Sequence, residues 1–168
     1  MIRKAYHILV AALILGILVV PRAPLAEDAF MLLSFEEAQE LQLDDAEWAK
    51  GGMPKSLGHG IGPKIVFESP MVKETDKGLL IDSPSQMDLV VLFKDGISPV
   101  DMETLNIKAK KGWFSKSLTK RLEPYLLGQS IRANDVKIPS GRFKLEIKVA
   151  DKDGNESIQE YLCEIREE

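Results

Sequence analysis

The chain has 168 residues, of which 45% are hydrophobic and 29% are charged, and its formal net charge is −4. This length and composition fit one ordinary globular domain with short additions. A slightly acidic chain lacks the basic excess of nucleic-acid-binding proteins, so we expect no nucleic-acid partner. The single cysteine, Cys163, excludes an intramolecular disulfide.

The first 26 residues have the pattern of a secretory signal peptide. Arg3 and Lys4 give a positive start, and Ala26 precedes the acidic Glu27. Residues 8–20 are uninterrupted apolar sequence. The alternative is a retained anchor, but a helix over this apolar run rises only about 20 Å, less than the roughly 30 Å of a hydrocarbon core. We expect cleavage after Ala26, export to the periplasm or cell surface, and no stable membrane span afterwards.

The negative charge is concentrated in a short segment. Loss of residues 1–26 would remove three bases and no acid, which takes the formal net charge from −4 to −7. Residues 27–50 hold eight acids and one base, whereas the chain from residue 51 onward holds eighteen of each. The imbalance therefore belongs to residues 27–50, and the remainder of the exported chain is neutral.

Residues 27–50 are expected to form an acidic helical segment. Ser34-x-x-Glu37 is a capping box, in which a hydroxyl and a carboxylate satisfy the first free amides of a helix. Asp44-x-x-Glu47 has the same pattern, so one helix and two short helices both remain open. A helical wheel places the apolar residues on one side, with Leu41 and Trp48 as the expected partner-facing contacts: Phe35, Ala38, Leu41, Trp48 and Ala49.

Residues 51–62 are rich in glycine and proline, which predicts a flexible linker before a separate unit at residues 63–168. From Lys64 onward the pattern changes to short strands separated by turn signals. We expect one helical turn at residues 118–122 and strands at residues 64–67, 78–81, 87–93, 105–109 and 130–133.

The clearest element is a β-hairpin between residues 138 and 165. Apolar residues alternate with charged residues along its first strand: Phe143, Leu145, Ile147 and Val149. Residues 151–155 supply a tight turn, and the return strand places Tyr161, Cys163 and Ile165 on one face. Because a hairpin cannot bury its apolar face alone, an opposing sheet is required. About seven strands in roughly 105 residues predict an all-β, immunoglobulin-like two-sheet sandwich with Cys163 buried in its core.

Two stretches resemble a known family. Residues 139–151, reading PSGRFKLEIKVAD, and residues 153–157, reading DGNES, resemble the last two strands of bacterial immunoglobulin-like and fibronectin type III-like modules. Residues 83–93, Val100-Asp101 and Thr104-Leu105 are similar to their early strands. The resemblance covers residues 62–166 and implies a sandwich, a fold that serves adhesion, spacing, sugar binding and assembly alike. The chain departs from the family in lacking an inter-sheet cysteine pair, and Phe143 stands where tyrosine is often found.

The sharpest candidate site is a basic stretch with two aromatic residues at its centre. Residues 108–121 contain no acid, and their basic and aromatic residues are Lys108, Lys110, Lys111, Trp113, Phe114, Lys116, Lys120 and Arg121. Such a group suits an acidic polysaccharide, an anionic lipid surface or an acidic protein face. We favour the alternative in which the lysines are solvated while Trp113 and Phe114 close the end of the sandwich. A third possibility is that the acidic helix docks its Trp48 side beside this stretch.

Signals for metal binding and catalysis are weak. Asp151, Asp153 and Asn155 resemble the opening of a calcium loop, but Gly154 comes too early and no glutamate closes the loop. A plain hairpin turn explains all of these residues. His59, the one histidine outside the expected signal peptide, lies in the glycine-rich linker, which disfavours a catalytic triad. We expect no metal, no cofactor and no enzymatic activity.

The sequence thus predicts a secreted, non-enzymatic binding or scaffolding module of a bacterial cell envelope. The expected partner is an envelope protein. The alternative is a carbohydrate-binding module that reads acidic glycans through Trp113 and the neighbouring lysines.

Overall fold

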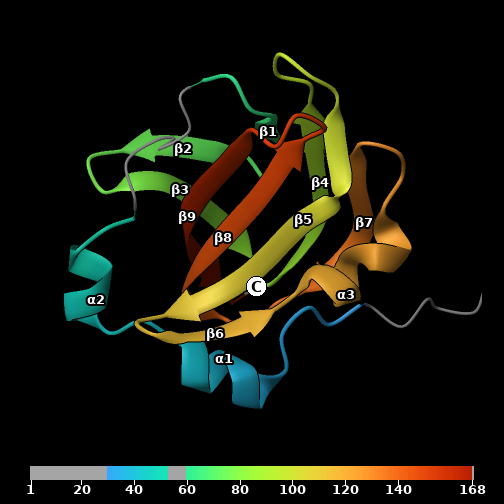
Figure 1. Cartoon of the computed structure of the whole chain (residues 1–168). Coiled ribbons are helices and arrows are strands. Elements are labelled where there is room, and N and C mark those ends of the chain that lie inside the picture. The colour runs from blue at the N-terminus through green and yellow to red at the C-terminus, as the bar shows by residue number, and fades with distance from the viewer. Residues whose placement is uncertain (1–29, 53–59, 168) are drawn as a thin grey trace, which may run out of the picture.

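The protein is described by a computed structural model that covers residues 30–52 and 60–167 (Figure 1). The helical elements are α1 (Phe35–Leu41), α2 (Asp45–Ala49), α3 (Thr119–Leu122) and the 3-10 turn η1 (Glu123–Tyr125). The strands are β1 (Lys64–Ser69), β2 (Val72–Thr75), β3 (Gly78–Pro84), β4 (Gln86–Lys94), β5 (Val100–Lys111), β6 (Phe114–Ser117), β7 (Ser130–Lys137), β8 (Gly141–Asp151) and β9 (Glu156–Arg166). No helix among the described residues is both long and apolar enough to cross a membrane.

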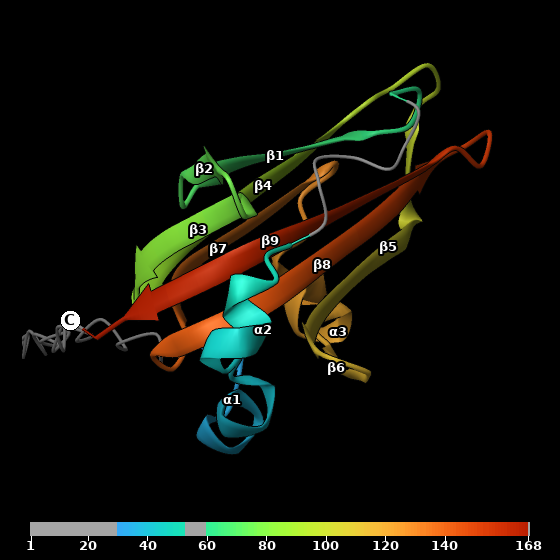
Figure 2. The ribbon, with the colours of Figure 1, turned by 90° about the vertical axis from the view of Figure 1, so that its left-hand side faces the viewer.

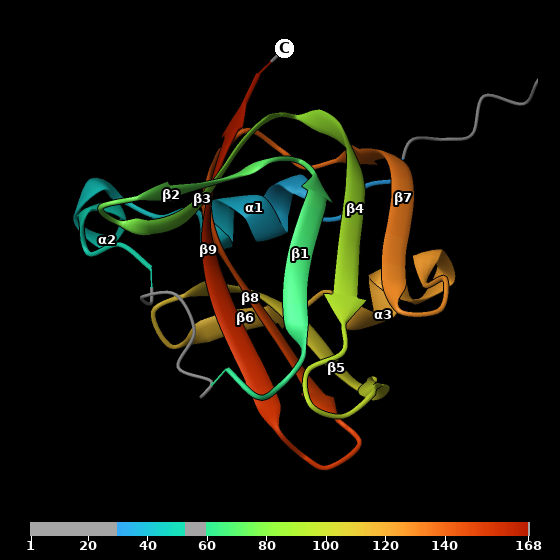
Figure 3. The same cartoon turned by 90° about the horizontal axis from the view of Figure 1, so that it is seen from above.

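The strands form two facing sheets, of order β1-β4-β7 and β2-β3-β9-β8-β5-β6 (Figures 2 and 3). β1 pairs with β4 in one sheet, whereas β3 pairs in parallel with β9 in the other. In immunoglobulin lettering, β1, β4 and β7 correspond to A, B and E, and β6, β5, β8 and β9 correspond to C′, C, F and G. β2 and β3 extend the second sheet beyond strand G. The strand order confirms the predicted immunoglobulin-like two-sheet sandwich.

The predicted C-terminal hairpin is confirmed as β8 and β9. Phe143 faces Cys163 and Leu145 faces Tyr161 across the pair. Phe143, Ile147, Val149, Tyr161 and Cys163 are buried, because the same face packs against the three-stranded sheet. The alternation of apolar and charged residues therefore sets the register, since a slip of one residue would turn this face to water.

The structure contains more strands than the pattern predicted. The five expected strands upstream of the hairpin are present as β1, β3, β4, β5 and β7, most of them longer than expected, and the helical turn is present as α3. β2 and β6 were not predicted. β2 reads Val-Lys-Glu-Thr and β6 reads Phe-Ser-Lys-Ser, so neither has enough apolar residues to show a period. Both lie at the edges of the six-stranded sheet, so each forms hydrogen bonds with only one neighbouring strand and needs few apolar residues.

Residues 30–52, which we call the strap, run around the sandwich and contribute Leu32, Leu33, Ala38 and Leu41 to its core. The strap begins beside β7, where the N–H of Leu32 donates to the carbonyl of Lys137 over 2.9 Å. α1 and α2 follow beside the six-stranded sheet (Figure 2). The strap ends at the β2–β3 turn, where Gly51 has a φ of 75° and a Cβ there would lie 2.7 Å from the carbonyl oxygen of Lys77. A larger residue could not make this approach. Residues 53–59 of the expected linker, including His59, lie outside the described residues.

The strap holds two short helices, which settles the choice that the sequence left open. Each helix begins with a complete capping box, Ser34 with Glu37 and Asp44 with Glu47. Between them the backbone is extended at Gln42, and the N–H of Leu43 donates to the carbonyl of Arg142 over 2.8 Å. The helix is interrupted because this amide is bound by β8.

The predicted apolar side of the strap is only partly correct. Leu41 is 0% exposed, and Ala38 is also buried. Phe35, expected on the same side, is 67% exposed, and Ala49 is exposed as well. Phe35, the first residue of α1, borders a surface hollow that is also lined by Gln86 and Lys137.

Because Leu41 is fully enclosed, Leu41→Ala should lower the free energy of unfolding by about 2 to 4 kcal/mol. Phe35→Ala is the matched control and should cost less than about 1 kcal/mol, since its ring already contacts water. Urea unfolding of both variants measures the difference. Equal costs would mean that α1 does not pack on the sandwich in solution.

Candidate functional site

The basic stretch forms the β5–β6 hairpin and the α3 turn that follows it. The hairpin reverses over two residues, Gly112 and Trp113, and Gly112 adopts a φ of 56°. A glycine at the first position of a two-residue turn is the requirement of a type II′ hairpin. Trp113 at the tip is 96% exposed. It has the largest exposed fraction of the large apolar side chains in the part of the chain that the structure describes.

The two aromatic residues of the stretch have different environments. Phe114 is half-buried against the core, and the Lys116 ammonium lies 5.4 Å from the centre of its ring. The Trp113 and Phe114 rings meet edge to face, with 6.4 Å between their centres. The favoured expectation, that both residues close the end of the sandwich, is therefore right for Phe114 and wrong for Trp113. The short turn carries Trp113 beyond the core.

Half of the six basic residues are engaged within the molecule. Arg121 pairs with Glu37, Lys116 with Glu40 over 3.8 Å, and Lys110 with Glu146 over 2.6 Å. For the other three, no acid of residues 30–52 or 60–167 lies within ion-pair distance: Lys108, Lys111 and Lys120. The basic stretch therefore presents less positive charge to a binding partner than its sequence alone suggests.

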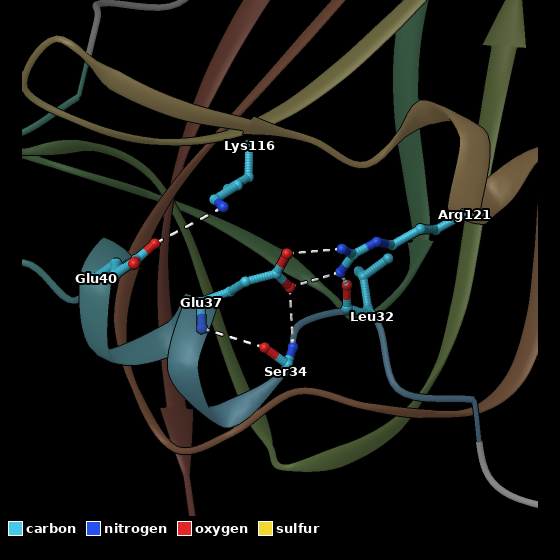
Figure 4. A network of polar contacts seen from close by, with 6 residues as sticks. All are labelled: Leu32, Ser34, Glu37, Glu40, Lys116 and Arg121. Carbon is cyan, nitrogen blue, oxygen red and sulfur yellow. Dashed lines mark hydrogen bonds and ion pairs between the residues drawn. The ribbon is translucent and has the colours of Figure 1, made fainter.

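Arg121 fastens the strap to the sandwich (Figure 4). Its two terminal nitrogens donate to the two carboxylate oxygens of Glu37, each over 2.7 Å, and one also donates to the carbonyl of Leu32 over 2.8 Å. The same Glu37 carboxylate accepts from the N–H of Ser34 over 3.1 Å and so completes the cap of α1. A bidentate pair of this kind fixes orientation as well as distance. We call this group the Arg121 latch.

The hydrogen bond from Arg121 holds the pKa of Glu37 at about 2, below the ordinary value of 4.5. Partial burial of Glu37 acts in the opposite direction, and the Ser34 amide adds to the lowering. The pKa of Arg121 is raised in turn by Glu37. The latch is therefore fully ionised at neutral pH.

α2 lies beside the tip of the β5–β6 hairpin (Figure 1). A Cβ atom on Gly112 would lie 3.9 Å from a carboxylate oxygen of Glu47, so the two segments lie close together. Trp48 in the same helix packs on the guanidinium of Arg142, 5.1 Å from the ring centre, and Arg142 pairs with Asp45 over 3.0 Å. The third possibility, docking of the acidic segment beside the basic stretch, is therefore observed. Its contacts differ from the expectation, because Glu37 and Glu40 meet the basic stretch while Trp48 meets β8.

We call the exposed area formed by the hairpin tip and α2 the hairpin–helix surface; it comprises Asp44, Asp45, Glu47, Lys111, Gly112 and Trp113. The sequence identified Trp113 and Lys111 and offered docking of the acidic segment beside them as a third possibility, but it did not place Glu47 at the hairpin tip. The sequence analysis also did not predict that Arg142 supports Trp48. The alternation along β8 indicated that Arg142 points outward, but it did not indicate which residue of the strap packs on it.

Asp151 serves the β8–β9 turn. Its carboxylate accepts hydrogen bonds from the N–H groups of Asp153 and Asn155 and from the Asn155 side chain. Burial opposes ionisation of Asp151, but these bonds and one from the backbone of Ser98 together outweigh it, so the pKa is lowered. The calcium-like pattern therefore has a local role in the turn.

Groups suited to catalysis or metal binding are sparse in the described residues. No cluster of three or more histidine, cysteine, aspartate or glutamate side chains there could hold a metal ion. Cys163 is buried as predicted, and burial raises the pKa of its thiol to about 12. A thiol in that environment is a poor nucleophile at neutral pH.

No protein-family model matches the sequence, and no curated protein matches it either. Among solved structures, the chain is similar to murine CRIg, with 10% sequence identity and a TM-score of 0.34. The match covers 62% of this chain and 98% of that chain. So distant a likeness carries no weight, and the immunoglobulin-like assignment rests on the strand order.

The Arg121 latch predicts an acid-sensitive component of stability. Because the pKa of Glu37 is lowered on folding, its stabilising effect is complete above pH 4.5 and is lost as the pH falls toward about 2. Glu37→Gln should remove about 1 to 2 kcal/mol at neutral pH, less than full linkage would give, because the Arg121 side chain is 37% exposed.

Urea unfolding between pH 2 and neutrality measures this component, with Glu36→Gln as the control of equal charge change on the exposed side of α1. The stability of Glu37→Gln should depend less on pH than that of the wild type or of the control. Parallel pH profiles for all three proteins would show that the latch does not form.

Proposed function

We propose that this protein is a non-enzymatic binding module of a bacterial cell envelope, exported by its N-terminal segment, and that it binds a protein partner through the hairpin–helix surface. The single observation that carries the proposal is the near-complete exposure of Trp113 at the tip of a short, well-paired hairpin. A tryptophan there contributes nothing to the core of its own chain.

An exposed tryptophan on a rigid support is suited to binding. Tryptophan, tyrosine and arginine are enriched among the residues that contribute most of the binding energy at protein interfaces. β5 is twelve residues long and is held between β6 and β8 in the six-stranded sheet, and Lys110 pairs with Glu146 of β8 close to the tip. The hairpin therefore presents Trp113 with little freedom to collapse onto its own surface.

The charge around Trp113 favours a protein over an acidic glycan. Lys111 and Trp113 flank Gly112 in the chain, and Glu47 of the acidic helix α2 lies close to that glycine. A polyanion would be repelled by the acids of α2, whereas a protein face of mixed charge can match both signs. The alternative, an acidic-glycan-binding module, is favoured by three lysines of the basic stretch that have no ion-pair partner among the described residues, and by the stacking surface that Trp113 offers to a sugar ring.

The compartment follows from residues 1–26, whose charged start, apolar run and small residue at position 26 support export. A fibronectin type III-like relationship within the bacterial modules is part of the same proposal. The place of β6 beside β5, in the sheet that faces β1, β4 and β7, supports it.

The protein-partner proposal is tested with a photo-cross-linking amino acid at position 113, compared with the same amino acid at position 97. Ile97 is a matched control because it is 75% exposed and lies in the β4–β5 turn, at the end of β5 away from Trp113. We expect position 113 to capture one envelope protein that position 97 does not.

With that protein purified, Trp113→Ala should weaken its binding at least about tenfold, while Ile97→Ala should leave it unchanged. Thermal unfolding should be the same for both variants, since neither side chain is buried. Equal capture from both positions, or full binding by Trp113→Ala, would exclude the hairpin as the docking site.

A glycan array distinguishes the protein-partner proposal from the glycan-binding alternative. Retention of an acidic glycan that is lost in Trp113→Ala and in Lys111→Gln would favour the carbohydrate-binding module. A blank array together with a specific cross-link at position 113 would favour the protein partner.

A further inference from the structure

We infer that the protein binds an amphiphile with one hydrocarbon chain and a zwitterionic head at the end of the sandwich where β7 leads into β8. The inference is carried by a surface hollow that shares one wall, Ile138, with an apolar cavity in the core. This site shares no residue with the hairpin–helix surface, so it is independent of the proposed function.

The cavity has a volume of about 50 Å³ and lies between the two sheets. Its lining is apolar throughout and comes from both sheets and from the strap, as Val91, Ile147 and Leu32 illustrate. Protein interiors are normally close-packed, and an unfilled cavity lowers stability. A cavity without polar lining stays dry and accepts apolar guests. The core of this protein therefore holds a space suited to a hydrocarbon group.

The volume of the cavity decides which hydrocarbon group fits. A cavity of about 150 Å³ in a protein interior takes up one benzene ring. About 50 Å³ is too little for such a ring, but it can receive the end of an unbranched chain. The rest of the chain must then lie outside the core.

The surface hollow offers a place for the rest of the chain. It has a volume of about 210 Å³ and is bordered by Met31 and Phe35, which are 42% and 67% exposed. Ile138 is the one residue that lines both the hollow and the cavity. It is half-buried, and its N–H donates to the carbonyl of Ser85 over 2.9 Å. A chain in the hollow can reach the cavity by displacing the Ile138 side chain while this backbone bond stays in place.

The polar rim of the hollow carries one charge of each sign. Lys137 is exposed, and no acid of residues 30–52 or 60–167 lies within ion-pair distance of it. Glu167 is also exposed, and its carboxylate accepts a hydrogen bond from the Ser140 hydroxyl over 3.2 Å. A zwitterionic head can place its phosphate near Lys137 and its ammonium near Glu167, whereas a purely anionic head would be repelled by Glu167.

The strap forms part of both spaces. Met31 and Phe35 border the hollow, and Leu32 lines the cavity. The carbonyl of Leu32 accepts a hydrogen bond from Arg121 over 2.8 Å, so the Arg121 latch also holds this wall of the cavity. A ligand that needs the docked strap should raise the melting temperature of the protein, because it binds the folded state alone.

Isothermal titration calorimetry of the purified exported protein with lysophosphatidylethanolamine, below its critical micelle concentration, tests the inference. We expect saturable binding that weakens about fourfold for each methylene removed from the chain. Lys137→Gln should weaken binding about two- to fivefold, as expected for an exposed charge pair. Lys152→Gln is the matched control, because Lys152 is also exposed but lies at the other end of β8, and it should bind as the wild type does.

The position of the chain end is measured by nuclear Overhauser effects between its terminal methyl group and the isoleucine methyl groups of the protein. We expect contacts to Ile147, which lines the cavity and is 1% exposed, and none to Ile97. Ile138→Phe places a larger side chain at the shared wall and should abolish the Ile147 contact. Thermal unfolding of this variant shows whether it is folded, and the wild-type contacts test the inference without it.

Absence of binding would overturn the inference. Contacts confined to Met31 and Phe35 would overturn it as well, because the chain would then lie only on the surface. Equal affinity for lysophosphatidylglycerol, which has an anionic head, would overturn the assignment of the head group. Trp113→Ala should bind the amphiphile as the wild type does, so failure here leaves the proposed protein partner unaffected.

Discussion

The contact between Arg121 and the strap is the constraint on which the candidate site depends. One guanidinium binds the Glu37 side chain and the Leu32 backbone at once. It therefore joins the start of the strap to the end of the basic stretch, two segments far apart in the chain. The two strap helices are too short to persist alone, so their position is set by this contact and by the burial of Leu41. Without it the sandwich would lack the helical half of the surface.

The sandwich itself acts as a rigid support. Its inner faces are filled by the alternating apolar residues of β4, β5, β8 and β9, and its outer parts carry the strap and the hairpin. Trp113, the most exposed large apolar side chain of the described residues, lies at a hairpin tip close to the strap. This division, a packed scaffold with variable segments at its ends, is how sandwich domains host many unrelated binding tasks.

Much of the fold could be predicted because the signals for its strands and helices lie within short stretches of the sequence. The period of two in residues 142–149 predicted β8, and the capping boxes at Ser34 and Asp44 marked both helix starts. β2 and β6 could not be predicted, because edge strands pair on one side and need little apolar sequence. For the site, the composition of residues 108–121 identified Trp113. Its exposure depends on a turn of two residues, and its neighbour Glu47 is brought close only by tertiary packing.

The position of β9 has a consequence for how the chain folds. β9 lies between β3 and β8, so the first and second halves of the larger sheet meet only through the last described strand. Until a ribosome has released that strand, β2 and β3 have no place in the sheet. Native pairing so rich in distant contacts is slow to form. The larger sheet can therefore close only after β9, the last strand of the described chain, has been made.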